Sequence, residues 1–198
     1  MYFKKLVGSR CYLSPINVED YEKYTQWVND MEVGVGMLFS SSMITPAREK
    51  DILVKLSNEY NFAIVDLEKD EAIGNIGFPR IDFINSVAEM GIFIGNKNYW
   101  GNGYGAEAIG LLLDFGFNIL NMHNIYLKVF SYNKPAINCY KKAGFKEAGR
   151  IRGAKKIAGE RYDEIYMDIL AKEYESGYIK SLVEKKQNAG HGEGGIYR

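Results

Sequence analysis

Three glycines within five residues mark the segment whose residue types most plainly suggest chemistry. They lie in 99-YWGNGYGAEA-108, directly before an apolar stretch with helical spacing. Glycine tolerates positive φ and leaves room for a ligand, and free N–H groups at a helix N-terminus attract anions. Gly101, Gly103 and Ala106 match the dinucleotide pattern G-x-G-x-x-G/A, whereas Gly103 and Gly105 match a different phosphate cradle. The segment therefore predicts a phosphate-binding turn of one of these two kinds.

The elements expected before this turn are mainly antiparallel strands. Their order is a strand at 10–14, helices at 18–30 and 46–58, and strands at 62–67, 72–83 and 86–95. Short links between the last three strands predict an antiparallel meander. The segment 31–45 mixes apolar residues with glycine and serine, which is typical of a substrate-facing loop.

The elements expected after the turn complete one α+β domain. They are a helix at 104–120, a strand at 124–130, a helix at 133–144, and strands at 146–157 and 162–170. We expect a mixed, mostly antiparallel sheet of about seven strands flanked by about four helices. The domain is expected to span 1–170, followed in 171–198 by a charged helix and a flexible, glycine-rich tail.

Composition excludes several classes of function. The 25 Lys and Arg balance the 25 Asp and Glu, so the chain lacks the excess positive charge that is typical of proteins that bind nucleic acid. The cysteines Cys11 and Cys139 are too few for a disulfide framework, and with two histidines they argue against a structural zinc site. No stretch approaches the roughly 20 apolar residues of a membrane span, and the N-terminus has no signal-peptide core. We expect a cytoplasmic protein without a membrane partner.

The context of the glycine turn separates the two phosphate interpretations. A dinucleotide site needs a parallel strand before the turn and an acidic residue at the end of the following strand. Here antiparallel strands precede the turn, and the following strand ends at Phe130. No Gly-Lys-Ser/Thr follows either, which excludes a Walker A loop. Tight packing of the strand against the helix remains a purely structural alternative.

Three ordered segments resemble the GNAT superfamily of N-acetyltransferases. They are 89-EMGIFIG-95, 99-YWGNGYGAEA-108 and 131-SYNKPAINCYKKAGFKEAGR-150. Each is weak alone, but their order and spacing are specific, and the resemblance covers about 9–170. It is strongest to the branch of ribosomal-protein N-terminal and spermidine N-acetyltransferases. It implies the GNAT fold and transfer of an acetyl group from acetyl-CoA, without a metal, to a primary amine of a small molecule, a polyamine or a protein N-terminus.

The resemblance also implies a set of cofactor-binding residues. In this family Q/R-x-x-G-x-G/A binds the acetyl-CoA pyrophosphate, and its glycines match Gly103 and Gly105. The chain departs from the pattern at Trp100, where relatives carry Gln or Arg. The pantetheine arm is expected to pair with the strand backbone at 92–94, as an added strand does. The implied cofactor-binding residues are Ile92, Phe93, Ile94, Trp100, Gly101, Asn102, Gly103, Tyr104, Gly105, Ala106, Asn133, Ala136, Ile137 and Tyr140.

Two residues are expected to move protons. Attack by an amine on the thioester requires a neutral amine, a stabilised oxyanion and a protonated leaving thiolate. Tyr140 matches the family tyrosine near the cofactor sulfur. A tyrosine pKa of about 10 exceeds a thiol pKa of about 8.5. Tyr140 is therefore expected to assist as an acid rather than to provide most of the rate enhancement. Glu89 is the candidate base, with a cross-strand ion pair as the alternative, and His123 is interpreted as structural.

The acceptor amine is left open by the sequence. A lysine-like amine costs about 4.6 kcal/mol to deprotonate at neutral pH, and a protein α-amine only about 1 kcal/mol. Asp30 and Glu32 are candidates for an acidic pocket that would suit a lysine-like amine. Alternatively, they are simply solvated charges. The alternative functions are a non-catalytic acyl-CoA sensor on the same fold and a nicotinamide-dependent oxidoreductase. A homodimer is expected from the family analogy alone.

Overall fold

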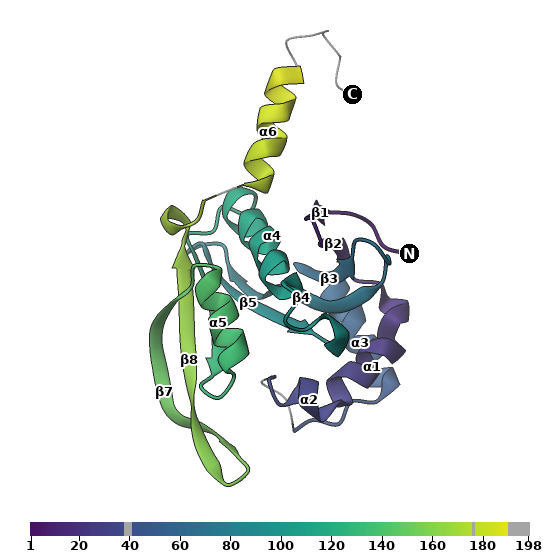
Figure 1. Ribbon diagram of the computed structural model, residues 1–198, viewed down its shortest axis with the longest axis vertical. Coiled ribbons are helices and arrows are strands. Elements are labelled where there is room, and N and C mark those ends of the chain that lie inside the picture. The colour runs from purple at the N-terminus through teal and green to yellow at the C-terminus, as the bar shows by residue number, and fades with distance from the viewer. Residues whose placement is uncertain (38–40, 176, 190–198) are drawn as a thin grey trace.

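The computed structural model describes residues 1–37, 41–175 and 177–189, and its centre is one mixed sheet (Figure 1). The strands are β1 (Leu6–Val7), β2 (Cys11–Pro15), β3 (Asn61–Asp66), β4 (Ala72–Asp82), β5 (Val87–Ile94), β6 (Asn124–Phe130), β7 (Lys146–Ile157) and β8 (Glu160–Leu170). They lie in the order β1-β2-β3-β4-β5-β6-β8-β7. Neighbouring strands are antiparallel except β5 and β6, which are parallel.

Helices flank this sheet. The α-helices are α1 (Tyr21–Asn29), α2 (Met31–Gly34), α3 (Pro46–Ser57), α4 (Tyr104–Asn118), α5 (Lys134–Lys142) and α6 (Tyr178–Ala189). The 3-10 helices are η1 (Val18–Asp20), η2 (Lys97–Tyr99) and η3 (Ala171–Glu173). The expected α+β fold around a single, mostly antiparallel sheet is confirmed, with eight strands instead of about seven in the described residues.

Among the strands and α-helices, β1 and α2 were not expected, because each is too short to show a periodic pattern. Helix α2 occupies the start of 31–45, where a loop was expected. Asp30 caps it by accepting a hydrogen bond from the N–H of Glu32 at 2.9 Å. The expected helix at 18–30 is divided into η1 and α1. Local polar contacts therefore decided the structure at these places, rather than apolar spacing.

Alternating side chains give the sheet two apolar faces. On β3, Phe62 and Ile64 belong to the core that contains α4 and α5. Ala63 and Val65 belong to a second cluster that packs against Trp27 of α1. Since successive residues of a strand point to opposite faces, α4 and α5 cover one face of the sheet and α1 packs against the other.

The parallel contact between β5 and β6 is short. It pairs Val87–Glu89 with 124–126 and then ends. Beyond this point β5 remains paired with β4 as far as Ile94, and β6 remains paired with β8 as far as Phe130. The two strands therefore separate at the middle of the sheet. We call the separated parts, Met90–Ile94 and Leu127–Phe130, the β5/β6 divergence.

Helix α6 extends away from the sheet beyond the end of α4 (Figure 1). The buried Asp114 of α4 accepts a hydrogen bond from the N–H of Ile179 at 2.8 Å, which anchors the first turn of α6. The helix expected within 171–187 thus begins at Tyr178, after η3. Most of the expected glycine-rich tail, 190–198, lies outside the described residues.

Candidate active site

The glycine turn leads directly into α4. Gly103 is the N-cap of this helix with φ of 87°, and Gly101 has φ of 74°. The N-cap has no side chain, so no side chain caps the helix there. Since the first N–H groups of an α-helix have no partner within the helix, this end presents several donors and the positive end of the helix dipole. The expected anion site therefore has the required backbone geometry.

Trp100 closes the turn instead of reaching into the anion site. Its indole Nε1 donates a hydrogen bond to the carbonyl oxygen of Ile94 at 2.8 Å. This bond ties the residue before the glycines to the end of β5. The ring remains 43% exposed. Trp100 thus organises the loop and brings no charged side chain to the turn.

The β5/β6 divergence presents backbone rather than side chains. Ile92 and Ile94 pack against the α4 core, whereas Phe93 lies on the opposite face against Tyr24 and Trp27 of α1. The edge of β5 that would face β6 consequently carries main-chain N–H and C=O groups. A ligand that adds to this edge as a strand would be recognised by its own amide groups.

Helix α5 lies beside the first turn of α4. A Cβ atom placed on Gly105 would stand 4.0 Å from the Sγ of Cys139. Ile137 is buried and Ala136 packs against the same core. The Asn133 side chain caps α5 by accepting a hydrogen bond from the N–H of Ala136 at 3.2 Å. The glycine turn and α5, although separated in sequence, are therefore adjacent.

Tyr140 lies on the α5 side of the sheet. Its ring packs 6.1 Å from that of Phe145, and it contacts the core shared with α4. Burial, with a smaller effect from Cys139, raises the pKa of the Tyr140 phenol well above its usual value of 10. The phenol carries its proton at neutral pH, as an ordinary tyrosine does, and the raised pKa makes it a weaker proton donor.

Glu89 lies where β5 and β6 part, on the face opposite α4. Its side chain is 9% exposed and its Oε2 accepts a hydrogen bond from the hydroxyl of Tyr126 at 3.0 Å. The Nζ of Lys128 lies 3.1 Å from Oε1, and the Nε of Arg80 lies 3.8 Å from Oε2. The cross-strand ion pair considered as the alternative is thus present. Tyr140 and Glu89 flank the sheet from opposite faces.

The sequence did not reveal Tyr126, Lys128 and Arg80 as partners of Glu89. Tyr126 and Lys128 lie on β6, and their approach depends on the parallel register of Glu89 with Tyr126. Arg80 lies opposite Glu89 on β4 beyond a register shift. The alternation of polar and apolar residues in 124-NIYLKVF-130 was the only available signal, since it places Tyr126 and Lys128 on one face.

The acidic candidates near α2 are paired. The Nζ of Lys97 lies 2.8 Å from Oδ2 of Asp30 and also forms an ion pair with Glu32. The hydrogen bond from Lys97 is the main reason that the pKa of Asp30 lies below its usual range. Lys97 therefore neutralises much of the negative charge that a polyamine pocket would require.

His123 takes part in the connection into β6 through its backbone. Its N–H donates a hydrogen bond to the carbonyl of Ser86 at 2.6 Å.

Two negative observations apply to the described part of the chain. Residues 1–37, 41–175 and 177–189 contain no cluster of three or more His, Cys, Asp or Glu side chains placed to hold a metal ion. Over the same residues, every helix is too short or too polar to cross a bilayer.

The fold and the turn before α4 define an acetyltransferase of the GNAT type. A family model for the acetyltransferase (GNAT) domain matches residues 10–146. The chain belongs to this family. It is 31% identical over 176 residues to an N-acetyltransferase of Bacillus licheniformis, which covers 85% of this chain and 97% of that relative. It is 34% identical over 116 residues to a spermidine N(1)-acetyltransferase of Vibrio cholerae, covering 59% of this chain and 66% of that protein.

A solved structure supports the same assignment. The spermidine N-acetyltransferase from Vibrio cholerae in complex with CoA and spermine superposes with a TM-score of 0.76 at 26% identity. The match covers 84% of this chain and 99% of the other. The protein is therefore an N-acetyltransferase that transfers an acetyl group from acetyl-CoA to an amine.

Proposed function

We propose that the acceptor is the primary amine of a small molecule, which attacks the thioester directly at the β5/β6 divergence. The observation that carries this proposal is the backbone edge of β5, which loses its β6 partner after Glu89 and leads toward the glycine turn. A pantetheine arm paired with this edge would connect the anion site at Gly103 to the carboxylate of Glu89. The thioester would then lie where both faces of the sheet are accessible.

The cofactor contacts belong to this proposal. The N–H groups at the start of α4, including those of Gly103 to Ala106, would bind the pyrophosphate. The backbone at 92–94 would pair with the pantetheine amides. Ala136, Ile137 and Tyr140 of α5 would pack along the other side of the arm. The adjacency of Gly105 and Cys139 supports this arrangement.

Tyr140 and Glu89 would divide the proton transfers. The Tyr140 phenol is protonated at neutral pH, as an acid for the leaving thiolate must be, and its raised pKa makes it an assisting donor rather than a strong acid. Both oxygens of Glu89 already accept donors from Tyr126 and Lys128. An amine proton would therefore reach Glu89 in competition with these groups, which favours transfer through a bridging water.

The charges around the site bear on the acceptor. The names of two relatives carry spermidine, which makes polyamines the first compounds to test. Asp30 and Glu32 are held by Lys97, however, and Glu89 is held by Lys128 and Arg80. These ion pairs leave less negative charge for an extended polycation than a dedicated polyamine pocket would offer. A small amine with a single positive charge fits this balance better.

A panel of acceptors tests the proposal. Release of free thiol from acetyl-CoA would be measured with monoamines, spermidine, spermine and peptides with a free N-terminus, at equal concentrations. The proposal predicts the highest kcat/KM for a small monoamine. Faster turnover of the peptides would overturn the acceptor assignment. CoA binding without turnover of any amine would instead favour an acyl-CoA sensor.

Location and assembly complete the proposal. We place the protein in the cytoplasm, because Cys11 and Cys139 are free thiols and acetyl-CoA is an intracellular metabolite. A homodimer is proposed from the family analogy. Sedimentation velocity at micromolar concentration tests the assembly, and a monomer at all concentrations would contradict it.

A further inference from the structure

The turn between β1 and β2 is fastened to the start of α4 by Glu107. One carboxylate oxygen of Glu107 accepts hydrogen bonds from the N–H groups of Arg10 at 2.7 Å and Cys11 at 3.1 Å. The other accepts from the hydroxyl of Ser9 at 2.8 Å. A Cβ atom on Gly8 would stand only 2.1 Å from the carboxylate, so glycine is needed for this approach. The β1–β2 turn is therefore held against the first turn of α4.

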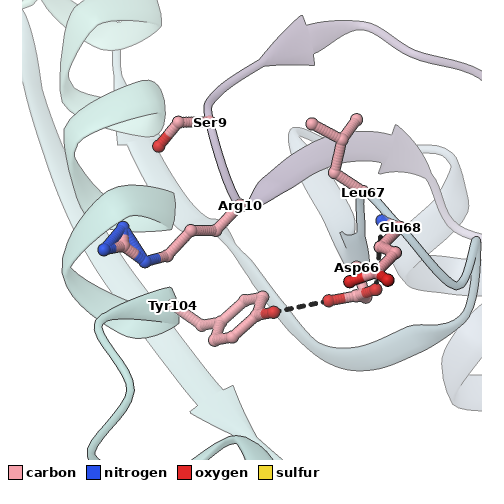
Figure 2. Close-up of a pocket in the computed structure, with 6 residues that line it drawn as sticks. All are labelled: Ser9, Arg10, Asp66, Leu67, Glu68 and Tyr104. Atoms are coloured by element: carbon pink, nitrogen blue, oxygen red, sulfur yellow. Dashed lines mark hydrogen bonds between the residues drawn. The ribbon is translucent and has the colours of Figure 1, made fainter.

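This fastening places the guanidinium of Arg10 beside the glycine turn. Its Nε lies 3.7 Å, and its Cζ 3.9 Å, from the position of a Cβ atom on Gly103. Figure 2 shows the side chain extended from the β1–β2 turn toward the start of α4, near the ring of Tyr104. The side chain is 55% exposed, so its donors are open to solvent.

Two nearby carboxylates, those of Glu107 and Asp66, are largely engaged by other groups, and Glu68 lines the same hollow as Asp66. The Nη1 of Arg10 lies 3.9 Å from Glu107, a long contact, and Glu107 already accepts three shorter hydrogen bonds. Asp66, which lines a hollow of about 380 Å³ together with Arg10, accepts from the Tyr104 hydroxyl at 2.6 Å and from the N–H of Lys69 at 2.7 Å. The Arg10 guanidinium thus retains capacity for a further anion.

Other polar groups of the turn are directed elsewhere. The indole N–H of Trp100 is used by the carbonyl of Ile94. The ammonium of Lys97, three residues earlier, is used by Asp30 and Glu32. A diphosphate at Gly103 would therefore meet backbone donors but no charge from these two residues. Arg10 lies on the adjacent strand turn and carries the missing charge.

We propose that the Arg10 guanidinium binds the diphosphate of coenzyme A at the N-terminus of α4, supplying from the β1–β2 turn the charge that Trp100 does not. The planar guanidinium presents paired donors that match phosphate oxygens. This inference rests on the proposed placement of the pyrophosphate at Gly103. It adds one residue of this chain, from a segment nearly one hundred residues away, to that site.

The test compares Arg10→Gln and Arg10→Lys with the wild type by isothermal titration with CoA and with dephospho-CoA. Arg10→Gln is expected to weaken both ligands about tenfold, equivalent to about 1.4 kcal/mol, and Arg10→Lys to weaken them less. In steady-state assays the KM for acetyl-CoA rises by a similar factor. The kcat/KM for S-acetylpantetheine, which has the thioester but no phosphate, stays at the wild-type value.

The controls separate binding from folding. Arg48→Gln removes an exposed arginine of α3 and should leave all constants unchanged. Wild-type affinity in Arg10→Gln would overturn the inference, and so would a loss confined to CoA, which would assign Arg10 to the 3′-phosphate. A parallel loss with S-acetylpantetheine would mean that Arg10 acts through folding. If the wild type itself binds neither ligand, the cofactor placement fails first, and the inference with it.

Discussion

At the scale of single residues, the catalytic hypothesis depends on two side chains that approach the sheet from opposite faces. Tyr140 carries its phenolic proton at neutral pH and burial raises its pKa further, whereas Glu89 is surrounded by the donors Tyr126, Lys128 and Arg80. Each can be removed without disturbing the other.

Replacing Tyr140 by phenylalanine keeps the ring and its packing against Phe145 but removes the phenolic proton. We expect kcat to fall about 10- to 100-fold, in the range of general acid catalysis, with the Kd for CoA unchanged. Pre-steady-state measurement of thiol release checks this. Wild-type kcat in Tyr140→Phe would contradict the acid role.

A second residue, Glu49 of α3, is expected to make the free energy of unfolding depend on pH. It is 3% exposed, and burial raises its pKa from 4.5 to about 7. Because the folded-state pKa is the higher one, the contribution of Glu49 to the unfolding free energy is greatest below pH 4.5 and is lost as pH rises through 7. Glu49→Gln should remove this decrease and stabilise the protein at pH 8 by about 1–3 kcal/mol. Urea unfolding at pH 5 and 8 measures it.

The exposed Glu184 of α6 provides the matched control for Glu49. Glu184→Gln should leave the difference in unfolding free energy between pH 5 and pH 8 as it is in the wild type. An unchanged pH dependence in Glu49→Gln would show that another group titrates.

At the scale of elements, α2 connects the two strands that diverge. Lys97, after β5, pairs with Asp30 and Glu32 at the start of α2. At the other end, the hydroxyl of Tyr132, after β6, donates to the carbonyl of Val35 at 2.6 Å. Helix α2 therefore links the segments that follow β5 and β6, and we expect it to border the acceptor site.

Lys97→Met should release one end of α2. We expect faster amide hydrogen exchange in α2 and a KM for the acceptor raised about three- to tenfold, because a looser wall orders the acceptor less well. Lys55→Met, at an exposed site on α3, is the control. Unchanged exchange in α2 would mean that the Tyr132 contact alone holds this helix.

The elements also show what the sequence could and could not predict. Thr45 and Pro46 predicted the start of α3, where the Thr45 hydroxyl accepts from the N–H of Arg48 at 3.3 Å. The glycine turn before α4 was equally readable, because positive φ restricts residue choice. The partners of Glu89 and the position of Arg10 could not be predicted. Both depend on how segments that are far apart in the sequence lie side by side in the fold.

At the scale of the whole molecule, the sheet consists of two antiparallel parts joined by one short parallel contact. One part contains β1 to β5 and the other contains β6, β8 and β7. Three residue pairs connect β5 to β6. The shared core of helices α4 and α5, the contacts of α2 and the side-chain contacts of Glu89 with β6 also connect the two parts.

A ligand that pairs with β5 should therefore strengthen this junction. We expect CoA to protect the backbone amides at 90–94 from hydrogen exchange and to raise the free energy of unfolding by about 2.7 kcal/mol at one hundred times its Kd. Exchange followed by mass spectrometry resolves this segment. Protection limited to 101–106, without 90–94, would show that the ligand binds the glycine turn but not β5.

The pairing of β6 with β8 also determines when the catalytic machinery can form during synthesis. The second wall of the β5/β6 divergence becomes part of a sheet only after residues 160–170 have left the ribosome. A chain that ends at residue 146, where the family match ends, would contain Glu89, the glycine turn and Tyr140 but would leave β6 as an unprotected edge. We therefore expect a nascent chain to gain activity only after residue 170 has left the ribosome.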